Sequence, residues 1–286
     1  MDTNKNRQCF CCPVCREEFS PERNSVRCKN GHSFDFAKEG YLNLLLSHQR
    51  RSKNPGDDAA MIAARRRFFD TGFFDPLKAV IADIIPTGAE CIMDCGCGEG
   101  GFCGGLSESR AGVFCGLDIS KDAIRAAAKR YKRAQWTVAN VMREIPTPDS
   151  TADVILSVLA PRNPPEFARI LKPGGVLILG VPGKDHLTEV RALLEQNSGD
   201  FDEKVDEAVE KCAPAFAEVG RRKISYEREL SGAQLNDLIQ MTPLFWNSSP
   251  AAREKALRCS SLAVTFCFSL LILNHAHSQK SNAFMK

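Results

Sequence analysis

Residues 90–101 read ECIMDCGCGEGG, and this stretch decides the fold. Its apolar opening predicts a strand, after which glycine occupies every second position in the loop from Asp94 through Gly96 and Gly98 to Gly100. Glycine has no Cβ and tolerates positive φ, so such a loop can turn sharply and bring its backbone against a ligand. The loop lacks the lysine of a P-loop and the G-x-G-x-x-G spacing of dinucleotide enzymes. The sequence therefore predicts a nucleotide-binding corner of another kind, with an ordinary tight turn as the alternative.

The chain after this loop continues an α/β pattern. Residues 112–118 predict a second strand ending in Asp118, about 20 residues beyond the glycines, where a carboxylate can accept hydrogen bonds from ribose hydroxyls. Residues 136–140 predict a third strand, and the continuous apolar run at 152–161 predicts a strand buried in a parallel sheet. Ligands of open α/β sheets bind at the carboxyl ends of the strands, so these strand ends should form one site.

The composition is that of a folded globular protein. The chain has 286 residues, of which 43% are hydrophobic and 26% are charged. No apolar signal segment follows the polar N-terminus, and the longest apolar run, at 262–273, is too short to span a bilayer and predicts an antiparallel strand. Thirteen cysteines in such a chain favour reduced thiols, so we expect a cytoplasmic protein with no membrane partner.

The net charge of +3 is too small to argue for nucleic-acid binding, but the charge is unevenly distributed. Residues 1–70 contain 13 basic and 9 acidic side chains, whereas the remainder contains 25 and 26. The positive excess therefore lies in the N-terminal quarter of the chain. This is a weak indication of a module that faces phosphate there.

Four potential metal ligands near the N-terminus follow the spacing C-x2-C-x12-C-x3-H, and they are Cys12, Cys15, Cys28 and His32. Three thiolates and one imidazole complete a tetrahedral zinc shell with no open position, which is the structural kind of site. A segment this short has too little apolar surface to fold alone, so the metal would supply folding free energy. Cys9 and Cys11 are rival ligands. Further alternatives are a redox C-x-x-C motif and four residues that are unrelated to one another.

A basic linker and a helix follow this segment. Asp57 or Asp58 can cap a helix that runs to about Asp70. The basic side chains of this region that could meet phosphates are Arg50, Arg51, Lys53, Arg65, Arg66 and Arg67. The alternative is the ordinary solvated face of a surface helix.

Beyond the zinc motif, five further segments occur in order: FDFAKEGYLNLL, RRSKNPGDDAAMIAARRRFFDTGFFDPL, MDCGCGEG, GLDISKDAIRAAAKRY and ILKPGG. In this order, and strongly over residues 9–186, the chain resembles the bacterial 23S ribosomal RNA (guanine-N1)-methyltransferase family. The resemblance implies an α/β fold, in which the Rossmann-like seven-stranded sheet of class I methyltransferases carries a small N-terminal zinc-binding domain. The implied domains are a zinc-binding RNA-recognition module at 1–45, a basic linker and helix at 46–75, and a methyltransferase domain at 76–286.

The same resemblance implies a function. Members of the family methylate N1 of a guanine in a 23S rRNA hairpin using S-adenosylmethionine, carry a structural zinc ion, and suggest a homodimer. The sequence leaves open which guanine is modified and whether the protein confers tylosin resistance. The competing interpretations are a class I methyltransferase that acts on another RNA, a small molecule or a protein, and a non-catalytic zinc-containing RNA-binding protein.

By this resemblance, the residues expected to contact the cofactor are Phe74, Asp94, Gly96, Cys97, Gly98, Glu99, Gly100, Asp118, Asn140 and His186. The family often has tyrosine at the Phe74 position, and a core aromatic is the alternative there. Asn140 could instead be an ordinary loop residue, and His186 could be structural.

The expected methyl-transfer position is Ala160-Pro161, which matches the family pattern. The nearby Asn163-Pro164-Pro165 is the closest approach to the motif of exocyclic amine methyltransferases, but it predicts a helix entry. Methyl transfer from a sulfonium depends mainly on alignment. A general base would help to remove the N1 proton, yet the sequence does not single one out among Asp94, Glu99 and His186, so no catalytic residue is assigned.

Overall fold

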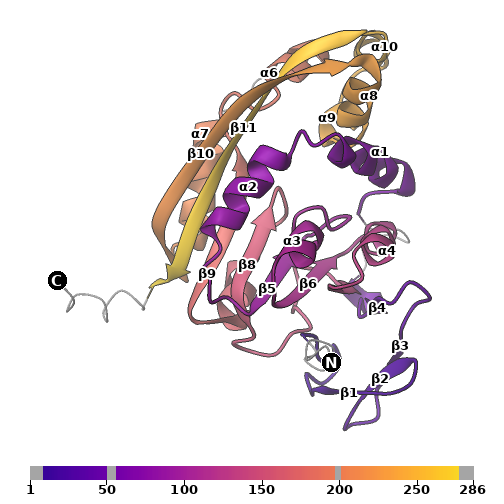
Figure 1. Ribbon diagram of the computed structural model, residues 1–286, viewed down its shortest axis with the longest axis vertical. Coiled ribbons are helices and arrows are strands. Elements are labelled where there is room, and N and C mark those ends of the chain that lie inside the picture. The colour runs from indigo at the N-terminus through magenta and orange to yellow at the C-terminus, as the bar shows by residue number, and fades with distance from the viewer. Residues whose placement is uncertain (1–8, 50–55, 197–200, 277–286) are drawn as a thin grey trace, which may run out of the picture.

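The protein is built on one large mixed sheet, with a small antiparallel sheet near its N-terminus (Figure 1). The computed structural model describes residues 9–49, 56–196 and 201–276. The strands of the large sheet lie in the order β10 (Phe216–Ser231), β11 (Ser261–His275), β9 (Leu171–Pro182), β8 (Ala152–Val158), β5 (Cys91–Cys95), β6 (Val113–Asp118), β7 (Gln135–Val138) and β4 (Leu42–Asn43). The small sheet contains β1 (Phe19–Pro21), β2 (Ser25–Cys28) and β3 (Ser33–Asp35).

The parallel part of the large sheet forms the predicted nucleotide-binding architecture. The strands from β4 to β9 run parallel to one another, and β11 and β10 extend the sheet antiparallel at one edge. Every residue of β5 is buried, and so is nearly all of β8, because neighbours cover both faces of a parallel sheet. The carboxyl ends of β5, β6 and β7 consequently meet at one edge, as the sequence predicts.

The expected count of seven strands is wrong, because the large sheet has eight. The additional strand is β4, which pairs in parallel with β7 through Leu42 and Thr137. Leu42 is 2% exposed and Leu44 donates its backbone N–H to the carbonyl of Val138, so this segment gains both apolar burial and sheet hydrogen bonds. A two-residue strand carries no periodicity that could announce it.

The helices are α1 (Ala59–Asp70), α2 (Asp75–Ile84), α3 (Cys103–Ser109), α4 (Lys121–Arg130), α5 (Pro164–Ile170), α6 (Thr188–Leu193), α7 (Phe201–Cys212), α8 (Gly232–Gln240), α9 (Pro243–Trp246) and α10 (Pro250–Leu257), with a 3-10 turn, η2, at Ser47–Gln49. The predicted capping is confirmed at α1, where the Asp58 carboxylate accepts from the N–H groups of Ala60 and Met61, each at 2.9 Å. None of the described helices is long and apolar enough to cross a membrane.

The antiparallel pair of β10 and β11 contains the two longest described strands, with 16 and 15 residues. The strand β11 exceeds the predicted range of 262–273, since its pairing with β10 continues from Phe216 opposite His275 to Ser231 opposite Ser261. In Figure 1, α8, α9 and α10 gather at one end of this strand pair, the end farther from the small sheet, and α1 lies beside them. The helix α1 therefore lies between these helices and the glycine-loop corner.

Candidate cofactor site and metal centre

The loop after β5 adopts a backbone that only glycine accommodates easily. Gly96, Gly98 and Gly100 have φ values of 86°, 56° and 82°. A Cβ added to Gly96 would lie 2.5 Å from the Cβ of Ala160, and one added to Gly100 would lie 2.6 Å from the ring of Trp136. The loop is thus pressed against the segment that follows β8, and the alternative of an ordinary tight turn does not explain this close approach.

Asp118 ends β6 directly beside this loop. Its carboxylate accepts hydrogen bonds from the backbone N–H of Gly98 at 3.0 Å and of Ser120 at 2.8 Å. Burial raises the pKa of this carboxyl group, and these two N–H donors and the positive charge of Arg65 oppose the rise. The predicted partnership between the glycine loop and the acid at the end of the second strand is therefore present in the fold.

Two further acids of the loop, Asp94 and Glu99, are buried with unpaired oxygens. Each is 1% exposed, and Asp94 Oδ2 and Glu99 Oε2 have no hydrogen-bond partner among the described residues. Burial raises the pKa of Asp94 to about 7, with a further increase from the negative charges of Asp118 and Glu99, and burial also raises the pKa of Glu99. Buried acceptors without partners are costly, so this corner suits a ligand that brings N–H donors and positive charge. The ammonium group of S-adenosylmethionine meets that requirement.

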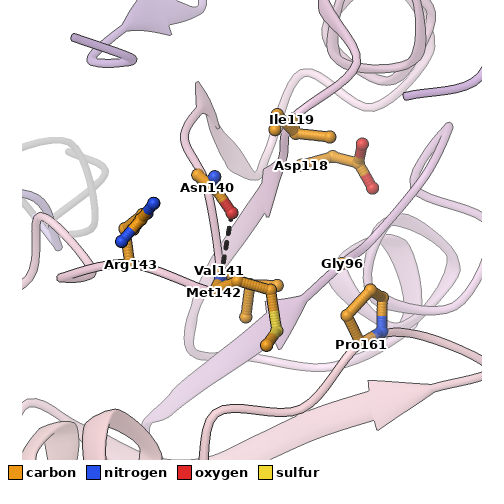
Figure 2. Close-up of a pocket in the computed structure, with 8 residues that line it drawn as sticks. All are labelled: Gly96, Asp118, Ile119, Asn140, Val141, Met142, Arg143 and Pro161. Carbon is orange, nitrogen blue, oxygen red and sulfur yellow. Dashed lines mark hydrogen bonds between the residues drawn. The ribbon is translucent and has the colours of Figure 1, made fainter. Parts of the chain in front are cut away.

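A pocket of about 400 Å³ opens next to the loop (Figure 2). Its lining combines the predicted residues Gly96, Asp118 and Asn140 with Ile119, Val141, Met142, Arg143 and Pro161. Of the second group, only Pro161 is predicted from the sequence, as part of the expected methyl-transfer position Ala160-Pro161. Their common signal is position, because they follow the carboxyl ends of β6, β7 and β8, where ligands of open sheets bind.

Asn140 organises the loop after β7 as well as lining the pocket. Its Oδ1 accepts from the backbone N–H of Met142 at 3.0 Å, as Figure 2 shows, and its Nδ2 donates to the carbonyl of Gln49 at 3.2 Å. The same loop is held from the other side by Asn163, whose Nδ2 donates to the carbonyls of Val141 and Arg143. Asn163 also precedes α5, which confirms the predicted helix entry.

Phe74 and His186 lie in an aromatic core near this corner rather than in the lining of the 400 Å³ pocket. The Phe74 ring is 3% exposed, with its centroid 4.7 Å from that of Phe69. His186 lies 4.5 Å from the Phe268 ring and accepts a hydrogen bond at Nδ1 from the backbone N–H of Cys267. Burial lowers the pKa of His186 to about 3, so the imidazole is neutral at physiological pH. Their contact with the cofactor remains a prediction.

The four predicted metal ligands converge in the small N-terminal module. All of their ligand atoms lie within 4.8 Å of one another, with Cys15 Sγ 3.6 Å from Cys28 Sγ, and with His32 Nδ1 3.5, 3.4 and 3.4 Å from the sulfurs of Cys12, Cys15 and Cys28. A tetrahedral Zn²⁺ at ordinary bond lengths places two sulfurs about 3.8 Å apart and a sulfur about 3.5 Å from a nitrogen. The side chains present therefore fit a structural zinc ion.

The rival ligand Cys9 belongs to a different group of cysteines. It forms a disulfide with Cys115 of β6, and its Sγ lies 3.9 Å from that of Cys91. The expectation of reduced thiols therefore fails at this pair, because the N-terminal segment packs against the sheet and brings Cys9 to β6. Cys11 is a buried free thiol outside the metal group, and its backbone N–H donates to the carbonyl of Pro146.

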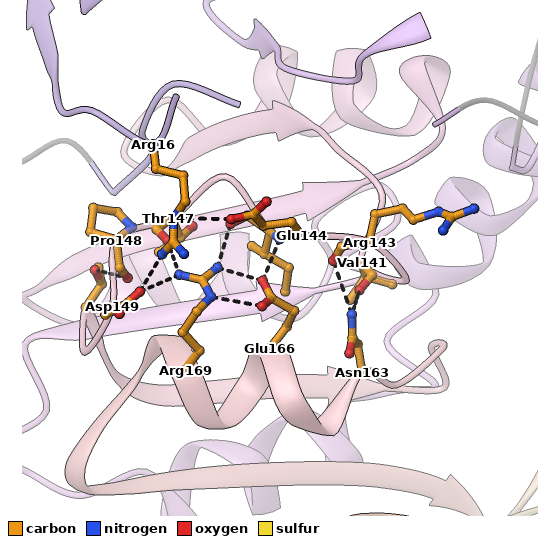
Figure 3. A network of polar contacts seen from close by, with 12 residues as sticks. Arg16, Val141, Arg143, Glu144, Thr147, Pro148, Asp149, Asn163, Glu166 and Arg169 are labelled. Atoms are coloured by element: carbon orange, nitrogen blue, oxygen red, sulfur yellow. Dashed lines mark hydrogen bonds and ion pairs between the residues drawn. The ribbon is translucent and has the colours of Figure 1, made fainter. Parts of the chain in front are cut away.

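A charged network fixes the metal-binding module to the sheet (Figure 3). Arg16, directly after the second cysteine ligand, forms ion pairs with Glu144, at 3.2 Å, and with Asp149. Arg169 of α5 reaches Asp149 at 2.8 Å and Glu166 at 2.6 Å, and it donates to the carbonyls of Ile145 and Thr147. The loop after β7 is therefore joined to both the module and α5.

The arginines of α1 contact the chain itself. Arg67 donates to the Asp237 carboxylate from Nε at 3.0 Å and from Nη2 at 2.6 Å, and Arg66 donates to the carbonyl of Ala126 at 3.3 Å. Arg65 faces the glycine loop. These contacts occupy part of each guanidinium group, and a contact of these arginines with RNA phosphate remains a prediction. The other predicted cations, Arg50, Arg51 and Lys53, lie outside the described residues.

Comparison with known proteins identifies both the zinc-binding segment and the methyltransferase segment of the chain. Residues 10–53 match the family described as the RlmA N-terminal domain, and residues 92–175 match a methyltransferase domain. The 23S rRNA (guanine(748)-N(1))-methyltransferase of Streptomyces fradiae is 36% identical over 84% of this chain and 86% of its own. The YxjB protein of Bacillus subtilis is 36% identical over 92% of this chain and 96% of its own.

One similar solved structure is described as "Conversion of a Disulfide Bond into a Thioacetal Group during Echinomycin Biosynthesis". Its TM-score is 0.50 and its sequence identity is 15%, over 70% of this chain and 81% of that chain. At this identity the likeness concerns the fold alone. The sequence relatives decide the family, since they extend over the zinc module and the methyltransferase sheet together. The chain belongs to the 23S rRNA (guanine-N1)-methyltransferase family.

Proposed function

We propose that this protein transfers the methyl group of S-adenosylmethionine to N1 of a guanine in 23S rRNA. The proposal rests on the presence of two sites beside one sheet. A glycine loop with Asp118 at its side lies at the carboxyl ends of the central strands, and a cysteine–histidine cluster is docked beneath the loop after β7. A relative from Streptomyces fradiae, 36% identical over 84% of this chain, carries this activity in its name.

The residues of the corner can bind and orient the cofactor. The Asp118 carboxylate can accept hydrogen bonds from the ribose, while the unpaired oxygens of Asp94 and Glu99 can accept from the ammonium group. Val141, Met142 and Pro161 provide apolar walls on the remaining side of the pocket. When bound, S-adenosylmethionine supplies an electrophilic methyl group, and holding it in line with the acceptor nitrogen provides much of the acceleration.

The acceptor base must leave its stack to reach a methyl group in this pocket. RNA-binding proteins usually take such bases from loops, which supports a hairpin target. Phe36 in the zinc module is 38% exposed and offers an aromatic ring to an unpaired base. His186 is a poor candidate for the general base, because burial lowers its pKa to about 3 and such an imidazole binds a proton weakly.

The proposal extends to a cytoplasmic protein that acts as a homodimer. The family resemblance supports the dimer, and an RNA substrate of ribosomal origin supports the compartment. Sedimentation of the zinc-loaded protein with and without a 23S rRNA hairpin measures the oligomeric state directly. A single monomeric species under both conditions would reject the dimer and leave the methylation proposal intact.

The decisive experiment maps methylation of 23S rRNA by mass spectrometry in cells that lack the gene and in cells that regain it. Wild-type protein should restore one methyl group on N1 of a guanine, and Asp118→Ala should not. Asp122→Ala, in the first turn of α4, is the matched control, because this side chain is 43% exposed and pairs with Arg125; it should restore the modification. If no 23S rRNA fragment changes mass between the strains, the RNA assignment is rejected in favour of another methyl acceptor.

A further inference from the structure

The N-terminal half of α1 lies over the cofactor corner. The Asp57 carbonyl, just before this helix, accepts a hydrogen bond from Ser120 Oγ at 2.7 Å, and Ser120 follows Asp118 by two residues. A Cβ added to Gly56 would lie 2.9 Å from that of Ser120, so the chain leading into α1 is in contact with the segment that ends β6. This contact directs the next turns of α1 across the glycine loop.

Arg65 is a charged residue of α1 that reaches the loop. A Cβ added to Gly98 would lie 3.3 Å from Arg65 Nη1, although the two residues are 33 positions apart in the sequence. The positive charge of Arg65 also lowers the pKa values of both Glu99 and Asp118, against the larger effect of burial. The guanidinium group therefore lies close enough to the loop to act on Glu99 within it and on Asp118 beside it.

The two ends of the Arg65 guanidinium group have different surroundings. Nη2 is anchored by the Asp57 carboxylate at 2.5 Å and by the carbonyl of Met241 at 3.3 Å. Nη1, the end directed at Gly98, has no hydrogen-bond partner among the described residues. One end of the group is thus held in place while the other keeps its donors available at the site.

We propose that Arg65 is a cofactor-binding residue that receives the carboxylate of the methionine part of S-adenosylmethionine on its Nη1 side. This inference rests on the proposed function only for the identity of the cofactor. The amino-acid tail is a zwitterion, and the corner offers it both signs of charge. The buried, unpaired oxygens of Asp94 and Glu99 can accept from the ammonium group, and the anchored arginine can donate to the carboxylate. An arginine whose other end is already fixed loses little conformational entropy when it binds such a group.

The test compares two ligands by titration calorimetry on the zinc-loaded full chain: S-adenosylmethionine and its decarboxylated form, which lacks only the carboxylate. Wild-type protein should bind the complete cofactor more tightly. Arg65→Gln should weaken binding of the complete cofactor by about tenfold or more, the value of a hydrogen bond to a charged group. It should leave the affinity for the decarboxylated form unchanged, so that the two ligands become similar, and Arg65→Lys should restore part of the difference.

Arg67→Gln is the matched control, since this arginine lies on the same helix and pairs with Asp237 away from the loop. It should leave both affinities unchanged. Equal weakening of both ligands by Arg65→Gln would show a structural role and overturn the proposal, and so would unchanged binding of both. Weaker binding of RNA alone would assign the arginine to phosphate and overturn it as well. Because these measurements use no RNA substrate, wild-type cofactor binding without rRNA methylation would reject the proposed function while leaving this inference standing.

Discussion

The zinc module and the cofactor corner hold their ligands in opposite ways. The four metal ligands lie within 21 consecutive residues, and the ion itself would close the cluster that they form. The cofactor corner instead draws on α1, β5, β6 and the loops after β7 and β8, which the packed sheet brings together. The first site therefore depends on metal and on local spacing, whereas the second depends on the folded sheet.

The largest effect should follow removal of zinc. Cys28→Ser breaks the tetrahedral set, and a structural zinc ion in a module of this size contributes about 10 kcal/mol of folding free energy. We expect loss of bound zinc, loss of hydrogen-exchange protection over β1–β3, and loss of more than 100-fold in rRNA methylation. Affinity for S-adenosylmethionine should stay within about twofold, because the hydrophobic cluster that contains Cys97 and Trp136 includes no residue of β1–β3. A parallel collapse of cofactor affinity would show that the two regions fold as one unit.

The next largest effect should come from Asp118→Ala, measured by calorimetry with S-adenosylmethionine. This substitution removes the predicted ribose acceptor and the group that orients the N–H of Gly98. We expect affinity to fall by about 10- to 100-fold, as for loss of charged hydrogen bonds. Zinc content should not change. Asp122→Ala is the control on the same side of the sheet, and an equal loss of affinity there would refute a specific role for Asp118.

A smaller, pH-dependent effect should come from Asp94→Asn. The folded pKa of Asp94, about 7, exceeds its ordinary value of 3.8, so folding favours the protonated form. Its contribution to stability is therefore fully present at low pH and is lost as pH rises from about 4 to about 7. Without cofactor, the variant should melt at a higher temperature than wild type at pH 8, with little difference at pH 4.5, while binding S-adenosylmethionine more weakly. An equal difference in melting temperature at both pH values would refute the pKa shift.

The pH dependence of His186 has the opposite sign. Its folded pKa of about 3 lies below the ordinary value of 6.5, so stability is lost as pH falls from about 6.5 towards 3. In wild type this change and that of Asp94 oppose each other over the shared interval. Asp94→Asn should therefore make the rise in melting temperature between pH 4.5 and 6.5 steeper.

The smallest effect should come from Arg16→Ala at the contact between the two regions. Arg16 is 43% exposed and its partners Glu144 and Asp149 are 55% and 65% exposed, so solvent screens these ion pairs. Such pairs contribute about 1 kcal/mol or less. We expect a small rise in protease cleavage near the module with melting temperature and zinc content nearly unchanged. Arg169→Ala should be more damaging, because Arg169 is 16% exposed and holds two backbone carbonyls as well.

The two regions also differ in how far the sequence predicts them. The spacing of the cysteines and His32 is sufficient to select the metal group, and residues 94–118 suffice for the loop and its acid. The identity of the strands β5, β6 and β8 follows from apolar runs that end in polar or glycine residues. By contrast, β4 is missed because two residues hold no pattern. The pairing of α1 arginines with Asp57 and Asp237 is also missed, because a run of like charges looks the same whether its partners are solvent, phosphate or acids distant in the chain.

The sequence by itself determined the chemistry available to this protein. It specifies a zinc shell of thiolates and one imidazole, a glycine-rich loop whose backbone can approach a ligand, and an acid at the end of the next strand. These features depend on separations of a few residues, which bond geometry translates directly into distance. Only the tertiary structure decided which groups meet across long separations, such as Arg65 with Gly98, Cys9 with Cys115, and Arg16 with Glu144. The reason is physical, since those contacts follow from how the sheet and its helices pack to bury apolar surface, and no local spacing encodes that packing.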